Sequence, residues 1–475
     1  LFPYTTLFRS HTPNEIRQPP VVTDSGVTVL DQAGNLLTLA ADGSTLASFS
    51  TEPPESFTVR DGLVVVAGRT DGVVRAYRLP DGSIAWRTPV LAAGPDRILR
   101  GSGDPRLTAE RLALLLRQAM DAGGATVDGD LILDRSAYAL PAHDPAAFDG
   151  QPLRPYNVGP DALMVAHRSV VLTLRPDPAR GVARIAVDLP LAGVQWPETV
   201  PLTGGECQDW RTQLAPDFTD LSRPRLTGRL AAACGERSWP IAFPEPAPAG
   251  FAARAIEAQW LALGGHIQGR VREGLTPAGA SVLTEWSSPA LPEVLRDMNK
   301  HSNNMIAQQV LLALAPGQPA QPATFEAARA EVQALALARG CREGELVIDN
   351  GSGLSRQERL TPRCLGRLLQ WSWRQPWMPE LLASLPVAGI ETTARRLVGA
   401  SGRAHLKTGS LEGVAALAGY VHGDDGRRHV LVAILNHPKA GSAQARAVLD
   451  EVVRWAADDL ARPGPAAFSA LKDSP

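Results

Sequence analysis

Four side chains suited to acyl transfer occur in two short motifs: Ser302 and Asn304 in Ser-x-Asn, and Lys407 and Thr408 in Lys-Thr-Gly. Acyl transfer by a serine needs a base, a proton relay and a site that stabilises the oxyanion. Each motif alone is weak, because Ser-x-Asn is commonly a helix cap and Lys-Thr-Gly can be a strand-edge turn. Their order, and their expected places after a helix and at the start of a strand, favour acyl transfer.

The segments around these motifs extend the pattern. Two of them are IDNGSGLSRQERLTP (348–362) and LPVAGIETTARRL (385–397). Ser-x-Asn and Lys-Thr-Gly are two of the three motifs of active-site-serine penicillin-recognising enzymes. With these segments, residues 96–460 resemble D-alanyl-D-alanine carboxypeptidase/endopeptidases of the class C penicillin-binding type, although Thr392 stands where that family commonly has glycine. Three upstream segments resemble the family's inserted domains: LRGSGDPRLT (99–108), GDLILDRSAY (129–138) and PLRPYNVGPDALMV (152–165).

The resemblance implies a catalytic role for three of the residues. Ser302 would relay a proton, the Asn304 amide would bind the substrate's peptide carbonyl, and Lys407 would supply positive potential.

The same resemblance implies how the substrate would bind. Thr408, Gly409 and Ser410 would contact it, with the Thr408 hydroxyl on its terminal carboxylate and the glycine allowing close approach of the backbone. The implied substrates are peptidoglycan stem peptides, cleaved at terminal D-Ala and at cross-links, and β-lactams acylate the family's nucleophilic serine. The implied location is the periplasm, and neither a cofactor nor a metal is expected.

The family's third motif, Ser-x-x-Lys, carries the nucleophile and precedes the inserted domains. In this sequence the motif occurs only as Ser469-Ala470-Leu471-Lys472, in a Pro/Ala-rich tail. We interpret that match as coincidental, because the nucleophile should begin a buried helix between the other two motifs. The chain is therefore expected to be catalytically incomplete.

Two other functions are alternatives to a carboxypeptidase/endopeptidase. A non-catalytic peptidoglycan-binding protein, fused to an interaction module, would use Asn304, Lys407 and Thr408 equally well. A β-lactamase is disfavoured, because residues 96–250 have no place in that compact fold.

The N-terminal region has a different character. Residues 1–10, LFPYTTLFRS, match a translation of a common sequencing-adapter primer, and the first methionine is Met120. We therefore expect residues 1–10 to be an artefact and the reading frame to be chimeric. Residues 11–92 read as short strands in which the turn Asp42-Gly43 recurs 39 residues later as Asp81-Gly82. A period near 40 indicates propeller blades, so this piece is predicted to be a partial, quinoprotein-like propeller.

The expected fold class is α/β (α+β). A β-lactamase/transpeptidase-like domain would span residues 251–461, with inserted mainly-β domains at 96–250 and a flexible tail at 462–475. Helices are predicted at 104–124, 251–265, 291–315, 325–340 and 443–461, and strands at 127–134, 168–177, 404–410, 414–421 and 427–436.

Composition limits the remaining functions. A formal net charge of −2, with no long basic run, gives no electrostatic case for nucleic acid. No apolar run is long enough to span a bilayer, although loose association with a membrane surface is compatible with the sequence. The four cysteines form no Cys-x-x-Cys pair, which disfavours zinc. Cys207 and Cys234 flank a Trp/Gly-rich stretch and could form a disulfide in an exported protein, the alternative being four unpaired thiols.

Overall fold

The computed structural model describes residues 16, 19–24, 26–51, 54–68, 73–79, 81–89, 96–244, 248–318, 320–424 and 426–458. Contacts divide the chain into two units, of which the first comprises residues 1–97, 127–130 and 267–270 and the second the remainder. The expected artefact at 1–10, the tail at 462–475 and the Ser469–Lys472 motif lie outside the described residues. Among the helices that are described, none combines the length and the apolar character needed to cross a membrane.

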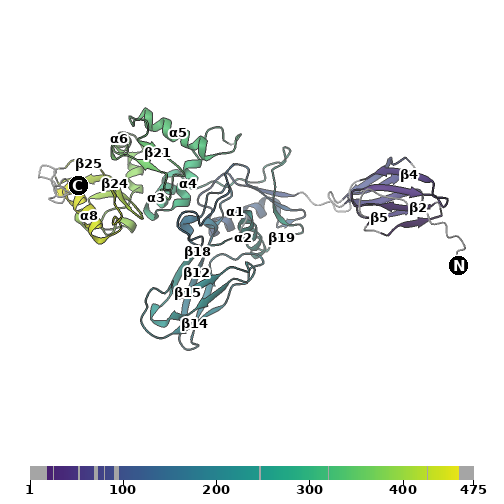
Figure 1. The fold of residues 1–475 in the computed structure, drawn as a ribbon, viewed down its shortest axis with the longest axis horizontal. Coiled ribbons are helices and arrows are strands. Elements are labelled where there is room, and N and C mark those ends of the chain that lie inside the picture. Colours follow the sequence, from purple (N-terminus) through teal and green to yellow (C-terminus); the bar gives the residue numbers. More distant parts are fainter. Residues whose placement is uncertain are drawn as a thin grey trace. The chain divides into compact units, whose positions relative to one another are not determined.

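The N-terminal unit contains two four-stranded antiparallel meanders (Figure 1). Asp42 and Asp81 sit at equivalent turns, where each carboxylate accepts a hydrogen bond from the backbone N–H two residues on. Leu30, Val64 and Tyr77, from both meanders, share one core. The strand–turn–strand repeat is therefore present, whereas the propeller assignment stays a prediction. The strands are β1 (Val21–Thr23), β2 (Gly26–Leu30), β3 (Asn35–Leu39), β4 (Thr45–Ser50), β5 (Pro54–Arg60), β6 (Leu63–Gly68), β7 (Val73–Arg78) and β8 (Ile84–Pro89).

In the second unit, helix α1 (Ala109–Gly123) lies within the helix predicted at 104–124, and it begins after Thr108 because the Thr108 hydroxyl accepts a hydrogen bond from the Arg111 N–H. Helix α2 (Pro248–Ala262) contacts α1 and strand β20 (Val271–Glu273), and β20 pairs in parallel with β11 (Leu131–Asp134). Residues on both sides of the expected boundary at 250 thus share this layer. Strand β9 (Arg97–Arg100) pairs with β11 on its other edge, and β10 (Thr126–Val127) pairs with β19 (His266–Ile267) in a separate two-stranded sheet.

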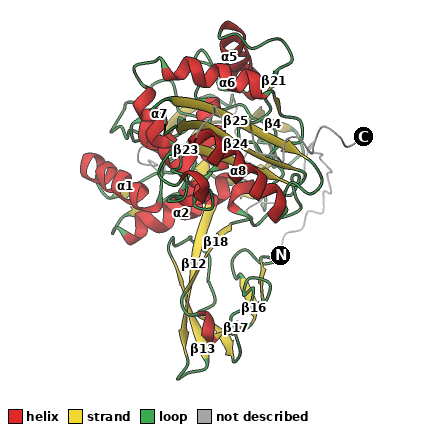
Figure 2. Ribbon diagram, turned by 90° about the vertical axis from the view of Figure 1, so that its left-hand side faces the viewer, coloured by secondary structure: helices red, strands yellow, loops and turns green. Residues whose placement is uncertain are grey.

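A mainly-β insert lies between α1 and α2 in the sequence and extends from the helical part of the unit (Figure 2). Its main sheet has the order β17-β14-β13-β12-β18, and β15 and β16 form a separate hairpin. A disulfide joins Cys207 to Cys234 beside these strands. The strands are β12 (Ser169–Asp177), β13 (Val182–Val187), β14 (Thr199–Thr203), β15 (Leu214–Asp217), β16 (Arg225–Gly228), β17 (Leu230–Ala231) and β18 (Arg237–Ala242).

The C-terminal part carries both chemical motifs. Strands β23 (Ala404–Leu411), β24 (Val414–His422) and β25 (Arg428–Asn436) form an antiparallel sheet, with the apolar face of α8 (Ala443–Asp458) packed on it. The mixed α/β content with several sheets agrees with the expected fold class. The other elements are α3 (Leu291–His301), α4 (Asn304–Leu312), α5 (Phe325–Ala338), β21 (Leu346–Val347), β22 (Arg359–Leu360), α6 (Pro362–Trp373) and α7 (Met378–Ser384).

Candidate active site

Ser302 lies at an elbow between two helices, inside the helical region predicted at 291–315, where the sequence indicates a loop or turn for the Ser-x-Asn motif. It follows α3 in a left-handed conformation with φ 51° and ψ 48°, which few non-glycine residues adopt. Asn303 then begins α4, because its side chain accepts a hydrogen bond from the Ile306 N–H at 3.0 Å. The elbow ends α3 at His301, leaves Ser302 half-buried beyond it, and makes Asn304 the first residue of α4.

Lys407 joins the two motifs. Its Nζ lies 2.6 Å from the Ser302 Oγ and 2.8 Å from the carbonyl oxygen of Thr408. Burial lowers the pKa of the Lys407 ammonium. Within the described part of the chain no carboxylate pairs with it, so its positive charge is available to an anionic ligand. The structure therefore brings together the lysine and the serine that the sequence singled out.

The strand that carries Lys407 also carries the expected substrate-binding residues. Thr408 is half-buried, whereas Gly409 and Ser410 are exposed. A methyl group added at Gly409 would meet the Ala416 Cβ at 3.8 Å, an ordinary contact, and Gly409 has no positive φ. Protein packing therefore does not demand glycine here, so any such demand comes from a ligand that approaches the backbone.

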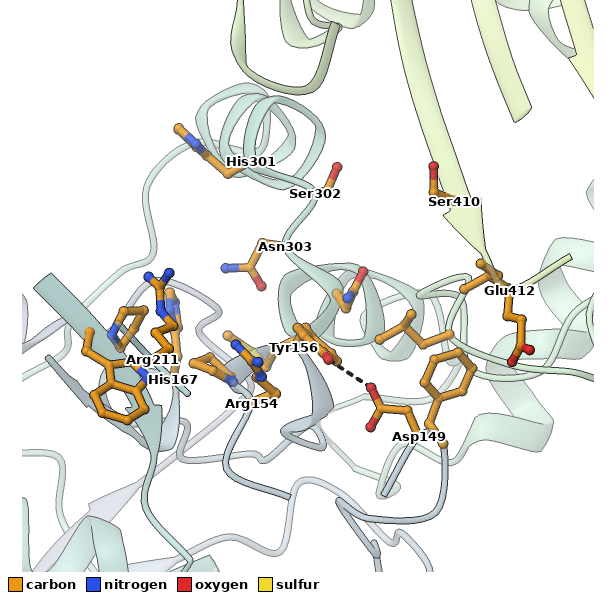
Figure 3. A pocket seen from close by; sticks show the side chains of 18 of the residues that line it. Asp149, Arg154, Tyr156, His167, Arg211, His301, Ser302, Asn303, Ser410 and Glu412 are labelled. Atoms are coloured by element: carbon orange, nitrogen blue, oxygen red, sulfur yellow. Dashed lines mark hydrogen bonds between the residues drawn. The ribbon is translucent and has the colours of Figure 1, made fainter. Parts of the chain in front are cut away.

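A cavity of about 890 Å³ opens beside these residues. Ser302, Asn304 and Ser410 line it, and Figure 3 shows the Ser302 and Ser410 side chains on facing walls. Lys407 and Thr408 are not among the lining residues, and Lys407 reaches the cavity through its bond to Ser302. The other lining residues are His301, Asn303, Met305, Leu411, Glu412, Phe148, Asp149, Arg154, Pro155, Tyr156, His167, Arg211, Trp239, Pro240, Leu354 and Arg356.

Sequence reasoning missed most of that lining. Asp149 accepts hydrogen bonds from the Tyr156 hydroxyl at 2.8 Å and from the Asn157 amide at 2.7 Å. Burial opposes ionisation of Asp149, but these hydrogen bonds prevail and lower its pKa. The segment 152–165, which contributes to this part of the lining, was singled out for its resemblance to the family's inserted domains. Nothing in its sequence indicated that it lies near Ser302.

A second network holds α3 in place below the elbow. Lys300 forms an ion pair with Glu391 and donates a hydrogen bond to the Leu385 carbonyl at 3.1 Å. Next to Glu391, Thr392 has a φ of 35°, in the region that favours glycine. The glycine common at this position in the resembled family thus has a conformational reason.

The four cysteines form two disulfides, Cys207–Cys234 and Cys341–Cys364. The second was not anticipated, because spacing alone does not reveal connectivity. It links the end of α5 to the start of α6. No group of three or more potential metal ligands occurs among the residues whose side chains are described.

Comparison with known proteins gives consistent results. Residues 82–459 match the D-Ala-D-Ala carboxypeptidase 3 (S13) family. The chain is 26% identical over 361 residues to D-alanyl-D-alanine carboxypeptidase DacB of Haemophilus influenzae, covering 74% of this chain and 73% of that protein. It is 29% identical over 388 residues to a D-alanyl-D-alanine carboxypeptidase of Actinomadura sp. (strain R39), covering 73% of this chain and 66% of that protein.

A solved structure shares the fold. Penicillin-binding protein 4 (dacB) from Haemophilus influenzae aligns with a TM-score of 0.61 at 25% identity, over 80% of this chain and 82% of that one. The same protein complexed with a novel β-lactam aligns with a TM-score of 0.56, over 79% and 81% of the two chains.

Proposed function

Because the chain belongs to the D-Ala-D-Ala carboxypeptidase 3 (S13) family, we propose that its cavity binds the D-alanyl-D-alanine end of peptidoglycan stem peptides. The observation that carries the proposal is the 2.6 Å contact between the Lys407 Nζ and the Ser302 Oγ at the cavity wall. The half-buried Lys407 ammonium, which pairs with no carboxylate among the described residues, favours an anionic ligand, and the substrate's terminal carboxylate is such a ligand.

Each motif residue has a part in this binding mode. The Thr408 hydroxyl, supported by Ser410 and the exposed backbone at Gly409, binds the terminal carboxylate. The Asn304 amide donates to the substrate's peptide carbonyl. The Lys407 ammonium holds the Ser302 hydroxyl beside the ligand. In an enzyme that also carries the nucleophile, such a hydroxyl would pass a proton to the departing D-Ala amine.

Formation of an acyl-enzyme needs a nucleophile in addition to these residues. The only Ser-x-x-Lys of the sequence is Ser469–Lys472. A nucleophile belongs on a rigid element beside its base, and a Pro/Ala-rich tail is a poor place for one. This chain is therefore proposed to recognise D-Ala-D-Ala peptides and β-lactams without turning them over.

Labelling with a fluorescent penicillin tests whether the chain can form an acyl-enzyme. We expect no label on the 475-residue chain after denaturing gel electrophoresis. A label that survives denaturation, and is mapped to a serine by peptide mass spectrometry, would contradict the proposed incompleteness. Loss of that label in Ser469→Ala would identify the tail motif as the nucleophile.

The alternative function is that of a natural binding protein fused to an interaction module. The observation that favours it is the shared core of the two N-terminal meanders, which form a packed unit. Resequencing the genomic locus across the codons for residues 80–100 distinguishes a natural gene fusion from a chimeric reading frame. An uninterrupted reading frame supports a natural fusion, and a break supports a chimeric one.

We also propose a periplasmic location, because two disulfides suit an oxidising compartment.

A further inference from the structure

The two chemical motifs lie on separate elements, because Ser302 follows helix α3 and Lys407 belongs to strand β23. Their contact therefore depends on how α3 and β23 are held relative to each other. Residues 384–394 contact both elements: the 3₁₀ helix η4 (Thr392–Ala394) packs against α3 and against β23. We call residues 384–394 the connecting segment.

Backbone hydrogen bonds attach the connecting segment to β23. Val387 and His405 form an antiparallel β-bridge, and the Leu406 N–H donates to the Pro386 carbonyl at 2.9 Å. His405 and Lys407 are two residues apart on one strand, so their side chains point to the same face of the sheet. The attachment thus lies directly beside the lysine of the site.

Side chains from the last turn of α3 attach the same segment to the helix. Lys300 forms an ion pair with Glu391 and donates to the Leu385 carbonyl at 3.1 Å. The Asn299 amide donates to the hydroxyl of the fully buried Ser384 at 2.8 Å. Both attachments lie immediately before the elbow, so they fix the end of the helix from which the elbow begins.

Glu391 is the point at which the two sets of bonds meet. Its Oε2 accepts hydrogen bonds from the Lys300 ammonium and, at 2.9 Å, from the N–H of Val387, the residue that bridges to β23. Burial opposes ionisation of Glu391, but these two bonds prevail and lower its pKa. The next residue, Thr392, has a left-handed φ of 35°, a conformation that persists only where its surroundings impose it.

We propose that Glu391 is a positioning residue, which with Lys300 sets the separation of α3 and β23 and so keeps the Ser302 hydroxyl within reach of the Lys407 ammonium. The inference rests on the proposed function, because the Ser302–Lys407 pair is where the D-Ala-D-Ala end binds. Hydrogen bonds weaken steeply with distance and angle, and a site that is about 1 Å too loose loses much of its function. A single carboxylate that binds both elements can prevent such loosening.

Binding of an N-acylated peptide ending in D-Ala-D-Ala to the full chain gives the first test. Glu391→Gln keeps the size of the side chain but removes its charge, and titration calorimetry should show about tenfold weaker binding. Lys300→Met should weaken binding by a similar factor. The double variant should lose no more than either single one, because both residues act through the same contact. Lys300→Arg keeps the cation and should restore most of the affinity.

Arg403→Gln is the matched control. Arg403 forms ion pairs with Asp424 and Asp458 beside the same sheet, and it does not line the cavity. Its loss should lower the melting temperature without changing the affinity for the peptide. Thermal melts of every variant establish that each is folded at the temperature of the titration.

A second measurement follows the position of Lys407 without any ligand. The chain has only four lysines, so ¹³C-labelled lysine gives few signals by NMR, and Lys407→Met assigns the one that matters. Glu391→Gln should move the Lys407 signal, because the lysine and the Ser302 hydroxyl separate. Arg403→Gln should leave that signal where it is. A residue that contributed to stability alone would not produce this difference.

The outcomes distinguish the inference from the proposed function. If Glu391→Gln leaves the Lys407 signal unmoved, or weakens binding no more than Arg403→Gln does, the inference is overturned while the proposed function stands. If the peptide does not bind the unmodified chain, the proposed function fails. The Lys407 signal alone then decides whether Glu391 positions the lysine.

Discussion

At the scale of single residues, Lys407 is half-buried and has the Ser302 hydroxyl as its described side-chain partner. Removing an ammonium partly from water without a carboxylate costs free energy, which an anionic ligand would offset.

Replacing this lysine separates stability from binding. Lys407→Met should weaken binding of a D-Ala-D-Ala peptide by about tenfold or more, since a charge-assisted hydrogen bond is lost. The same variant should leave the melting temperature unchanged or higher, because the buried charge disappears. Lys439→Met, at an exposed lysine, is the control for both measurements. A large loss of stability with unchanged affinity would assign Lys407 a structural role.

Thr392 is a second residue whose environment makes a prediction. A left-handed conformation costs an L-residue about 1–2 kcal/mol, whereas glycine costs about 0.5–1 kcal/mol through its freedom in the unfolded chain. Thr392→Gly should therefore raise the free energy of unfolding by about 0.5 kcal/mol in urea titrations. Thr393→Gly, at a neighbour without a positive φ, should lower it. Equal destabilisation by both substitutions would show that Thr392 is unstrained.

At the scale of elements, the helices with explicit end signals were the ones the sequence located well. Thr108 caps α1, and Gly123-Gly124 closes it. The sequence also predicts a loop or turn at Ser302–Asn304 inside 291–315, and the elbow between α3 and α4 lies there. The sequence did not reveal the ends of the two helices, because apolar spacing continues across α3 and α4 and the capping role of Asn303 is visible only in the structure.

The Cys341–Cys364 disulfide connects α5 and α6 and closes a loop with a sequence separation of 23. Restricting the unfolded chain over that length stabilises the fold by about 3 kcal/mol in the loop-entropy treatment. The double variant Cys341→Ala/Cys364→Ala should therefore melt at a markedly lower temperature than the parent under oxidising conditions. Under reducing conditions the difference should largely vanish. A difference that persists in reductant would point to lost packing around buried Cys364.

At the scale of the whole molecule, the family and the two chemical motifs could be predicted from sequence, whereas the cavity could not. Asp149, Arg154, His167 and Arg211 lie far from Ser302 along the chain, and only tertiary packing brings them to the same cavity. Nothing in the local sequence around Arg211 indicates its neighbours. The second disulfide was missed for the same reason, since connectivity follows from the fold.

Acid should destabilise the molecule through its half-buried imidazoles. Burial lowers the pKa of His167, His405 and His422; Lys300 adds to the effect at His405 and Arg428 at His422, while Glu391 opposes it at His405. Unfolded histidines titrate near pH 6.5, so the unfolded chain binds protons first as the pH falls. Stability should be complete above about pH 6.5 and decline as the pH falls towards the lower pKa values of the folded state.

Thermal melts between pH 7.5 and 5 measure this decline. The carboxylates with lowered pKa values, such as Asp134 at about 2, stay ionised in that window and do not contribute. The double variant His405→Gln/His422→Gln should flatten the dependence of the melting temperature on pH. The two rings lie 5.5 Å apart, so a positive charge on one ring opposes protonation of the other. A melting temperature independent of pH in the parent would show that these imidazoles are not held neutral.

The Ser302–Lys407 site is proposed to recognise a D-Ala-D-Ala terminus. Isothermal titration of the full chain with an N-acylated peptide ending in D-Ala-D-Ala tests it most directly, with the L-Ala-L-Ala peptide as the control. We expect saturable one-to-one binding of the D-peptide, none of the L-peptide, and marked weakening in Lys407→Met. Absence of binding, or equal binding of both peptides, would contradict it.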